Sequence, residues 1–215
     1  MRNSPLRHPP TSPGHPDYWR RLRPGARIVV RTRPSVEEQA ATAVAHRREL
    51  EVVAVRHVAV PDERGRLQGE YVIFDLRSRE APNTLIVSVA GARVAISVFG
   101  ALENGSAASR EELAQLGWGW IFEDGPAGPE YARYPSVPVV EGGHERRLPF
   151  AATFGGPLRG EYAAPGSDRA ATILIMEYAA LEPCDDPILV VLEEVDTGRV
   201  TVLSGNRVDP AQFER

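Results

Sequence analysis

Lysine is absent from this chain of 215 residues, and all 25 of its basic side chains are arginine. Without a lysine amine the protein cannot form a Schiff base, so pyridoxal-phosphate and lysine-aldolase chemistry are excluded. The same absence excludes nucleotide phosphotransferases that rely on a P-loop lysine or on the strand lysine of kinases. The 19 glycines and 19 prolines indicate a GC-rich coding bias, which explains the missing lysine without selection for function.

Cysteine and long apolar runs are also scarce. The single cysteine, Cys184, permits no intrachain disulfide, which fits a reducing compartment. The longest strongly apolar runs, residues 170–176 and 188–192, are far shorter than the ~20 residues that span a bilayer. The N-terminal residues carry positive charge but lack the apolar segment of a secretory signal. We therefore expect a soluble, cytoplasmic protein.

The histidines do not have metal-ligand spacing. All five are scattered along the chain, and no two of them form an HxH, HxxxH or HExxH pattern. A structural zinc site needs four ligands held in place, and a catalytic one needs three. We therefore expect neither a metal site nor a cofactor.

Charge is distributed unevenly along the chain. Residues 1–33 hold eight arginines and one acid, whereas residues 177–196 hold seven acids and no base. Arginine beside aromatic side chains is typical of surfaces that bind anionic membranes or nucleic acids. The sequence pI of 5.8 argues against nucleic acid as the main ligand. The binding residues that this pattern indicates are Trp19, Arg20, Arg21, Arg23, Arg27, Arg31 and Arg33.

Two kinds of partner for these arginines remain open. They can bind an anionic membrane surface, or they can pair with the acidic residues 177–196 of the same domain or of a second subunit. The second interpretation is favoured because residues 34–215 carry a net negative charge, with 17 arginines against 28 acids.

Hydrophobic alternation predicts strands rather than helices over most of the chain. Residues 1–17 contain five prolines and little apolar surface, so we expect a mobile tail followed by one β-rich domain over residues 18–215. Two short helices are predicted, over residues 35–48 and 109–116, each with a serine at its start and glutamates in its first turn. The predicted strands are residues 26–33, 49–60, 70–77, 84–90, 92–99, 118–123, 149–154, 161–163, 171–181, 188–195 and 199–203.

These elements indicate a mainly β protein with an antiparallel barrel-like or sandwich fold. A tight turn at Ala90-Gly91 predicts a hairpin between residues 84–90 and 92–99. A second turn after residue 154 predicts that residues 149–154 pair with residues 161–163.

Two stretches of the sequence share the same order of residue types. Glu70-Tyr71 and Glu177-Tyr178 are each followed by a proline, an apolar strand, a glycine and an Arg-Val pair. Both stretches predict three-stranded meanders, within units of about residues 22–105 and 118–215. Either these units arose by duplication, or two unrelated meanders share the same turn residues. A duplication would place Glu70 and Glu177 at equivalent positions.

The chain resembles a small bacterial β-rich domain at three places. Residues 22–29 are similar to the L-x-x-G-x-x-V start of that domain, and Glu70-Tyr71, Leu76 and residues 85–89 resemble its central ladder. Residues 177–178, 192–193 and 205–213 are similar to its closing strands. The family is an uncharacterised bacterial domain found beside phage-shock-type membrane-stress genes and a spermidine-synthase-like gene. The resemblance implies a β-rich bacterial accessory protein tied to the cell envelope, and it brings no catalytic residues.

Carboxylates and one histidine are the candidates for catalysis. A hydrolase would use Glu70 or Glu177 as an acid together with His57. Neighbouring residues of a strand point to opposite faces, so Glu193 and Glu194 cannot both serve one site. We interpret this acidic pair as part of a solvated edge strand that repels other edges. Three serines in or near predicted strands lack the G-x-S-x-G elbow of hydrolase nucleophiles, namely Ser88, Ser97 and Ser204.

The sequence holds no assembled catalytic constellation. It therefore favours a noncatalytic, cytoplasmic bacterial binding or scaffold protein that contacts another protein or a second copy of itself. The alternatives are the hydrolase described above and an envelope-associated adaptor that binds anionic lipid through its arginine-rich segment. The hydrolase requires a cleft shared by His57 and a carboxylate, and the adaptor requires a basic surface that is free to bind lipid.

Overall fold

Strands dominate the computed structural model of this protein. The residues that it describes are 12–32, 46–62, 64–77, 82–101, 122–125, 128–131, 136–141, 144–153, 157–163, 170–181 and 187–214. Its elements are α1 (Pro16–Arg21), β1 (Arg27–Thr32), β2 (His46–Pro61), β3 (Leu67–Arg77), β4 (Pro82–Ala90), β5 (Arg93–Ala101), β6 (Phe122–Gly125), β7 (Gly128–Tyr131), β8 (Ser136–Glu141), β9 (His144–Ala152), β10 (Leu158–Ala163), β11 (Ala170–Ala180), β12 (Pro187–Glu194), β13 (Arg199–Val208) and the 3₁₀ turn η1 (Pro210–Gln212).

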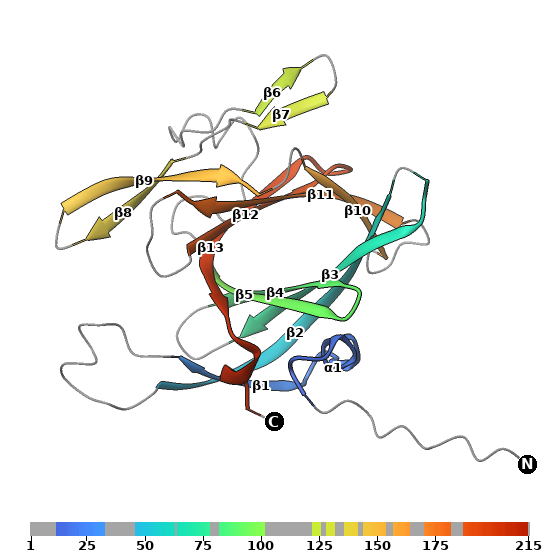
Figure 1. Cartoon of the computed structure of the whole chain (residues 1–215), viewed down its shortest axis with the longest axis vertical. Coiled ribbons are helices and arrows are strands. Elements are labelled where there is room, and N and C mark those ends of the chain that lie inside the picture. The colour runs from blue at the N-terminus through green and yellow to red at the C-terminus, as the bar shows by residue number, and fades with distance from the viewer. Residues whose placement is uncertain are drawn as a thin grey trace, which may run out of the picture.

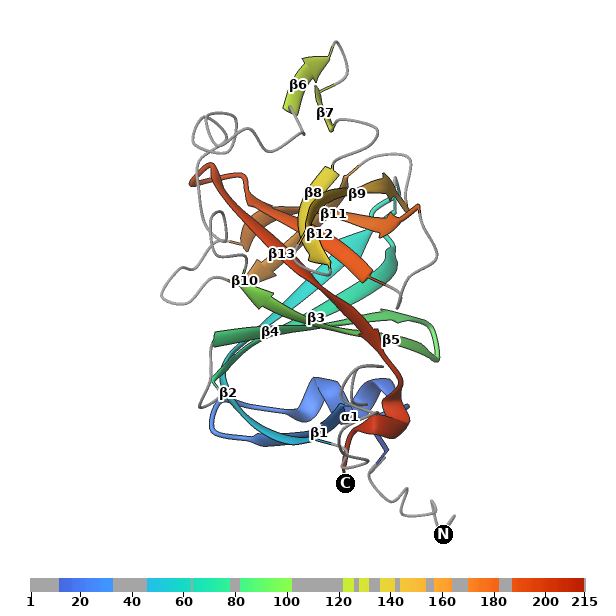
Figure 2. The ribbon, with the colours of Figure 1, turned by 90° about the vertical axis from the view of Figure 1, so that its left-hand side faces the viewer.

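Eight of these strands form a closed antiparallel barrel. Their order is β2-β3-β4-β5-β13-β12-β11-β10, and β10 returns to pair with β2. Figure 1 looks into the barrel, with β3, β4 and β5 on one side of the interior and β11 and β12 on the other. Figure 2 shows the same strands from the side, crossing one another obliquely. The predicted mainly β, antiparallel fold is confirmed, and its form is a barrel.

The barrel consists of two four-stranded meanders with the same internal order. The first half is β2–β5 and the second half is β10–β13, and within each half consecutive strands pair antiparallel. The two three-stranded meanders that the sequence predicted are therefore present, each with one further strand. The two-residue turn after Ala90 contains Gly91 at φ 61°, a conformation that a residue with a Cβ rarely adopts.

Two seams join the halves, and a glycine lies at each. At the β5–β13 seam the paired residues run from Leu203↔Ala101 to Val208↔Ile96, and Gly205 pairs with Phe99. A Cβ on Gly205 would meet the Val98 carbonyl oxygen and would lie 2.8 Å from the Phe99 Cα. At the β2–β10 seam a Cβ on Gly160 would likewise meet the Val58 side chain. The close approach of backbones at the β5–β13 seam thus depends on Gly205, whereas Gly160 leaves room for the Val58 side chain at the β2–β10 seam.

Two hydrophobic cores lie on opposite sides of the barrel wall. The inner core fills the barrel with inward side chains from both halves, among them Ile73, Phe99 and Ile175. The outer core lies between the first half and the segments beneath it, α1, β1 and the chain near η1, and it is centred on Trp19. Each fully buried large aliphatic or aromatic side chain contributes roughly 1.5–3 kcal/mol to stability.

Several sequence predictions differ from the structure in detail. Residues 46–48 belong to β2 rather than to the end of a helix, and the rest of the helix predicted at 35–48 and all of that at 109–116 lie outside the described residues. Strand β9 pairs with β8 and β11, not with β10 as the turn after residue 154 predicted. Pro13 is buried and α1 begins at Pro16, so packing starts before Tyr18.

Strand β12 is a central strand, which corrects the interpretation of its acidic end. It pairs with β11 on one side and with β13 on the other, so Glu193 and Glu194 do not lie on a sheet edge. The two side chains do point to opposite faces, as the strand geometry predicted. Glu193 is only 6% exposed on the outer side, whereas Glu194 reaches Arg56 from the inner side. A residue buried to this degree cannot act as a repulsive edge charge.

Candidate binding site at the barrel mouth

His57 and Glu70, two of the candidate catalytic residues, are neighbours on the outer surface of the barrel. The His57 Nδ1 lies 3.5 Å from the Glu70 Oε1, and the Arg20 Nε donates to the Glu70 Oε2 at 2.7 Å. Arg20 also donates to Asp17 at 3.1 Å. The hydrogen bond to Glu70 raises the pKa of the Arg20 guanidinium above its ordinary value. Through its hydrogen bond with Arg20, Glu70 thus links α1 to strand β3.

Glu177, the third candidate, lies inside the barrel. Its Oε1 accepts a hydrogen bond of 2.8 Å from the Arg207 Nη2, which reaches it from β13 across β12. Inward residues of β3 have odd numbers, such as Tyr71, and so do those of β11, such as Glu177. Tyr71 has an odd number and Tyr178 an even one, so Tyr71 faces inward and Tyr178 faces outward. The Glu-Tyr pairs of the two halves therefore have opposite orientations. The predicted equivalence of Glu70 and Glu177 is therefore wrong, because a one-residue shift reverses the face of a strand.

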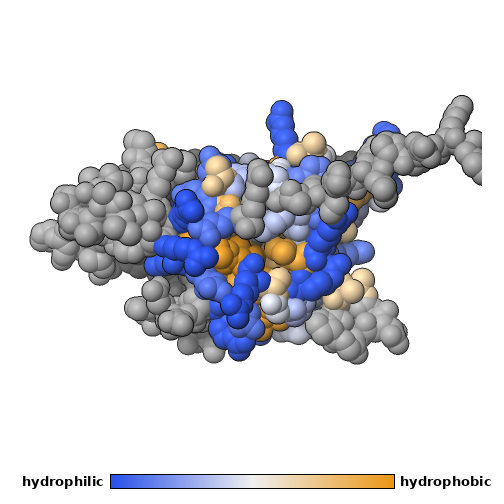
Figure 3. Space-filling model, turned by 90° about the horizontal axis from the view of Figure 1, so that it is seen from below, coloured by the Kyte–Doolittle hydropathy of each residue, from blue (hydrophilic) through white to orange (hydrophobic). Residues whose placement is uncertain are grey.

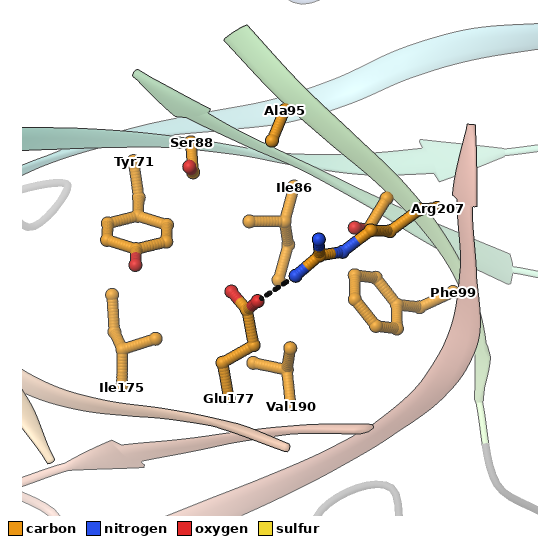
Figure 4. Close-up of a pocket in the computed structure, with 10 residues that line it drawn as sticks. Tyr71, Ile86, Ser88, Ala95, Phe99, Ile175, Glu177, Val190 and Arg207 are labelled. Atoms are coloured by element: carbon orange, nitrogen blue, oxygen red, sulfur yellow. Dashed lines mark hydrogen bonds and ion pairs between the residues drawn. The ribbon is translucent and has the colours of Figure 1, made fainter. Parts of the chain in front are cut away.

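A cavity of about 180 Å³ surrounds Glu177 at one end of the barrel. Its floor is apolar and comes from both halves, with Ile86 and Phe99 from the first and Ile175 and Val190 from the second. Figure 4 shows the ion pair of Glu177 and Arg207 in the middle of this space, beneath β4 and β5. The residues that line the cavity are Tyr71, Ile86, Ser88, Ala95, Ser97, Phe99, Ile175, Glu177, Val190 and Arg207.

Three hydroxyl groups face the cavity from the first half. They belong to Tyr71, Ser88 and Ser97, and within the described part of the chain none of them has a hydrogen-bond partner. Burial, and secondly the charge of Glu177, raise the pKa of Tyr71 to about 12. The tyrosine hydroxyl therefore stays protonated at neutral pH and can both donate and accept a hydrogen bond. Unpaired hydroxyls at the rim of an apolar space are groups that a ligand can satisfy.

The opposite end of the barrel carries a different cluster of charges. Arg56 lies 3.3 Å from Asp75 and 3.8 Å from Glu194. The buried Arg56 Nε has no hydrogen-bond partner among the described residues. Among the described residues, an arginine is therefore bound to one carboxylate at the Glu177 end and to two at the opposite end.

The arginine-rich N-terminal segment is largely bound to the chain itself. Arg27 pairs with Glu49 at 2.9 Å, Arg31 pairs with Glu214 at 2.8 Å, and Arg23 donates to two backbone carbonyls. The acids that these arginines and Arg20 contact in the described structure are Asp17, Glu49, Glu70 and Glu214, and none of these belongs to residues 177–196.

The remaining residues of that segment differ in accessibility. Trp19 is 0% exposed, packs against Phe213 and donates from its Nε1 to the Pro13 carbonyl at 2.6 Å. Arg21 is exposed, and Arg33 lies outside the described residues. Seen from below the barrel, hydrophilic side chains surround an apolar area (Figure 3). The buried tryptophan ring does not face solvent, where a membrane would meet it.

Sequence reasoning missed the cavity because its residues carry no motif. The available signal was a polar residue at an inward position of an apolar strand, as at Ser88 in β4 and Ser97 in β5. In the sequence, the serines suggest only a nucleophile. Arg207 carried no signal, because its partner Glu177 is 30 residues away and two strands across the sheet.

The described residues contain neither a metal-binding cluster nor a membrane-spanning helix. Within the described residues, no three histidine, cysteine, aspartate or glutamate side chains lie close enough together to hold a metal ion. None of the helices in that part of the chain is long and apolar enough to cross a bilayer. No protein-family model, curated protein or solved structure matches this chain. The family resemblance therefore stays a prediction from the sequence.

Proposed function

We propose that this protein is a noncatalytic binding protein that holds a small organic molecule in the mouth of its barrel. The observation that carries the proposal is the cavity of about 180 Å³ around the Glu177–Arg207 pair. Ligand sites in proteins are mostly apolar hollows with a few polar groups placed to fix orientation. The cavity has this composition, with an apolar floor, three hydroxyl groups and one ion pair.

Binding is favoured over hydrolysis by the positions of the candidate catalytic groups. His57 and Glu70 lie on the outer surface, whereas Glu177 lies in the cavity. The described residues that line the cavity include two serines but no histidine or cysteine, and a serine needs an adjacent base to act as a nucleophile. Glu177 accepts a hydrogen bond from Arg207 at 2.8 Å, so its carboxylate is already engaged and is not free to transfer a proton to a substrate.

The proposal keeps the noncatalytic class expected from the sequence and changes the kind of partner. The sequence predicts contacts with another protein, whereas a small hollow at the end of the barrel suits a small molecule better than a protein surface. A cytoplasmic location remains part of the proposal, supported by the single cysteine, which permits no intrachain disulfide.

A blocked mouth tests the proposal. Ala95 lines the cavity and is exposed, so Ala95→Trp should fill the mouth without disturbing the inner core. Ala163→Trp is the matched control, because Ala163 is exposed at the end of β10 and does not line the cavity. Saturation-transfer NMR with a library of small neutral, cationic and anionic fragments is the measurement.

We expect a set of fragments that bind the wild type and Ala163→Trp and that lose binding to Ala95→Trp. If no fragment shows this dependence on Ala95, the mouth is not a ligand site and the proposed function is wrong.

A further inference from the structure

We propose that the mouth cavity selects a small organic monocation, an alkylammonium or a guanidinium, and that Arg207 occupies the cation position until the ligand displaces it. This inference rests on the proposed function and names the chemistry of the ligand. The two charges in the cavity differ in how firmly the protein holds them.

Glu177 is the fixed charge of the pair and Arg207 is the movable one. The Glu177 side chain is 14% exposed, whereas that of Arg207 is 52% exposed. Arg207 can move into water at little cost, because about half of its side chain is already exposed. Glu177 is mostly buried and cannot move into water with Arg207. A carboxylate left unpaired in this apolar hollow is strongly disfavoured. Any ligand that displaces Arg207 must therefore supply a positive charge to Glu177.

An anionic ligand fits the same geometry poorly. To reach Arg207 inside the cavity it would lie beside the Glu177 carboxylate, and like charges at such a distance repel each other. It would also weaken the 2.8 Å hydrogen bond that neutralises Glu177. Once Arg207 has moved into water, the charge that remains of this pair is the negative one of Glu177.

The hydrogen-bonding groups of the cavity suit a cation with several N–H donors. The interaction with Arg207 uses only the Oε1 of Glu177 and one nitrogen, so the carboxylate keeps acceptor capacity. The hydroxyls of Tyr71 and Ser88 point into the same space as this carboxylate (Figure 4). A primary ammonium carries three donors and a guanidinium five, which can be shared among these oxygens.

The size and floor of the cavity limit the rest of the ligand. Pockets for drug-sized molecules occupy roughly 300–1,000 Å³, and this cavity of about 180 Å³ is smaller. Its floor of Ile86, Phe99, Ile175 and Val190 can cover a short alkyl chain or a small ring. The geometry therefore points to one positive charge on a compact apolar body.

Calorimetric titration of the full chain tests the charge preference. The probes are butylammonium, methylguanidinium, butyrate and butanol, and the proteins are the wild type, Arg207→Gln, Glu177→Gln and the control Arg199→Gln. Arg199 begins the same strand as Arg207 but does not line the cavity. Thermal unfolding checks that each variant folds, and Glu177→Ala replaces Glu177→Gln if the latter does not.

The two cationic probes should bind the wild type, and Arg207→Gln should bind them about tenfold more tightly because the internal competitor is gone. Glu177→Gln should lose this binding, and Arg199→Gln should match the wild type. Butyrate and butanol should bind none of the proteins measurably.

The inference is overturned if butyrate binds and Arg207→Gln abolishes that binding, if Arg207→Gln does not tighten cation binding, or if neither cation binds. These outcomes leave the proposed function standing as long as some neutral or anionic fragment binds the wild type and not Ala95→Trp. The absence of any fragment that depends on Ala95 removes both proposals together.

Discussion

The two halves of the barrel have the same strand order but make different contributions to its mouth. The first half, β2–β5, supplies the neutral hydroxyls of Tyr71, Ser88 and Ser97. The second half, β10–β13, supplies both charges, Glu177 and Arg207. Neither half alone contains a site, so the cavity exists only because the two seams close the barrel. Two halves with the same strand order thus place hydroxyl groups and charged groups in one cavity.

The outer sides of the halves differ as well. The outer face of the first half is covered by α1, β1 and the chain near η1, with Trp19 at the centre. The first half also carries Glu70 on this outer side, where Arg20 fastens α1 to it. The same Glu-Tyr sequence therefore serves attachment in one half and lines the interior in the other.

Removing the centre of the outer core should have the largest effect on stability. Trp19 is fully buried, and its ring lies 5.1 Å from that of Phe213 and 6.0 Å from that of Phe74. We expect Trp19→Ala to lower the free energy of unfolding by about 3–5 kcal/mol, measured by urea denaturation. Val53→Ala, at a residue that is 48% exposed, is the control and should change stability by less than about 0.5 kcal/mol. A loss below about 1 kcal/mol for Trp19→Ala would show that the outer core does not stabilise the first half.

The β5–β13 seam should be the next most sensitive region. In Gly205→Ala the new Cβ would meet the backbone at Val98 and Phe99, so the two strands would have to separate. We expect a loss of about 1–3 kcal/mol or more, measured by the same denaturation. Gly69→Ala is the matched control within a strand, because its Cβ would be 3.5 Å from the Val89 carbonyl oxygen, an ordinary contact. Equal losses in the two variants would contradict a special role for the seam.

Tyr71 should make the stability of the protein depend on alkaline pH. Its pKa is raised from 10.0 to about 12, so the folded protein retains the proton after the unfolded chain has lost it. The contribution of Tyr71 to the free energy of unfolding is complete below pH 10 and is lost as the pH rises towards 12. This free energy should fall by no more than about 1.4 kcal/mol per pH unit. Chemical denaturation between pH 9 and 12 should show a shallower decline for Tyr71→Phe than for the wild type. Parallel declines would mean that the pKa of Tyr71 is not raised.

The two glutamates should differ most clearly when each is neutralised. Glu70→Gln removes the negative charge that pairs with Arg20. Because this ion pair is partly exposed, we expect the free energy of unfolding to fall by about 1 kcal/mol or less and ligand binding to be unchanged. Glu177→Gln should leave α1 attached but abolish the binding of butylammonium. Thermal unfolding and calorimetric titration of both variants measure the difference. Loss of ligand binding in Glu70→Gln would show that the outer and inner sides of the barrel are coupled.

The sequence by itself determined where most strands lie. Alternating β-branched residues placed β1–β5, β11 and β12 to within a few residues, and turn residues such as Gly91 placed the hairpins. The strand predicted at residues 199–203 covers only the first half of β13. These are local properties, because side chains of a strand alternate with period two and a tight turn requires particular backbone angles. For the same reason the two meanders were predictable, since each pairs only strands that follow one another.

Only the tertiary structure decided which face of each strand is inside and which distant strands meet. The seams join residues more than 100 positions apart, such as Phe99 and Gly205, and no local pattern specifies that register. Where both faces of a strand are apolar, as in β3 and β12, alternation cannot distinguish inside from outside. Packing of the two cores makes that choice, and a shift of one residue would have exchanged Glu177 for Tyr178 in the cavity.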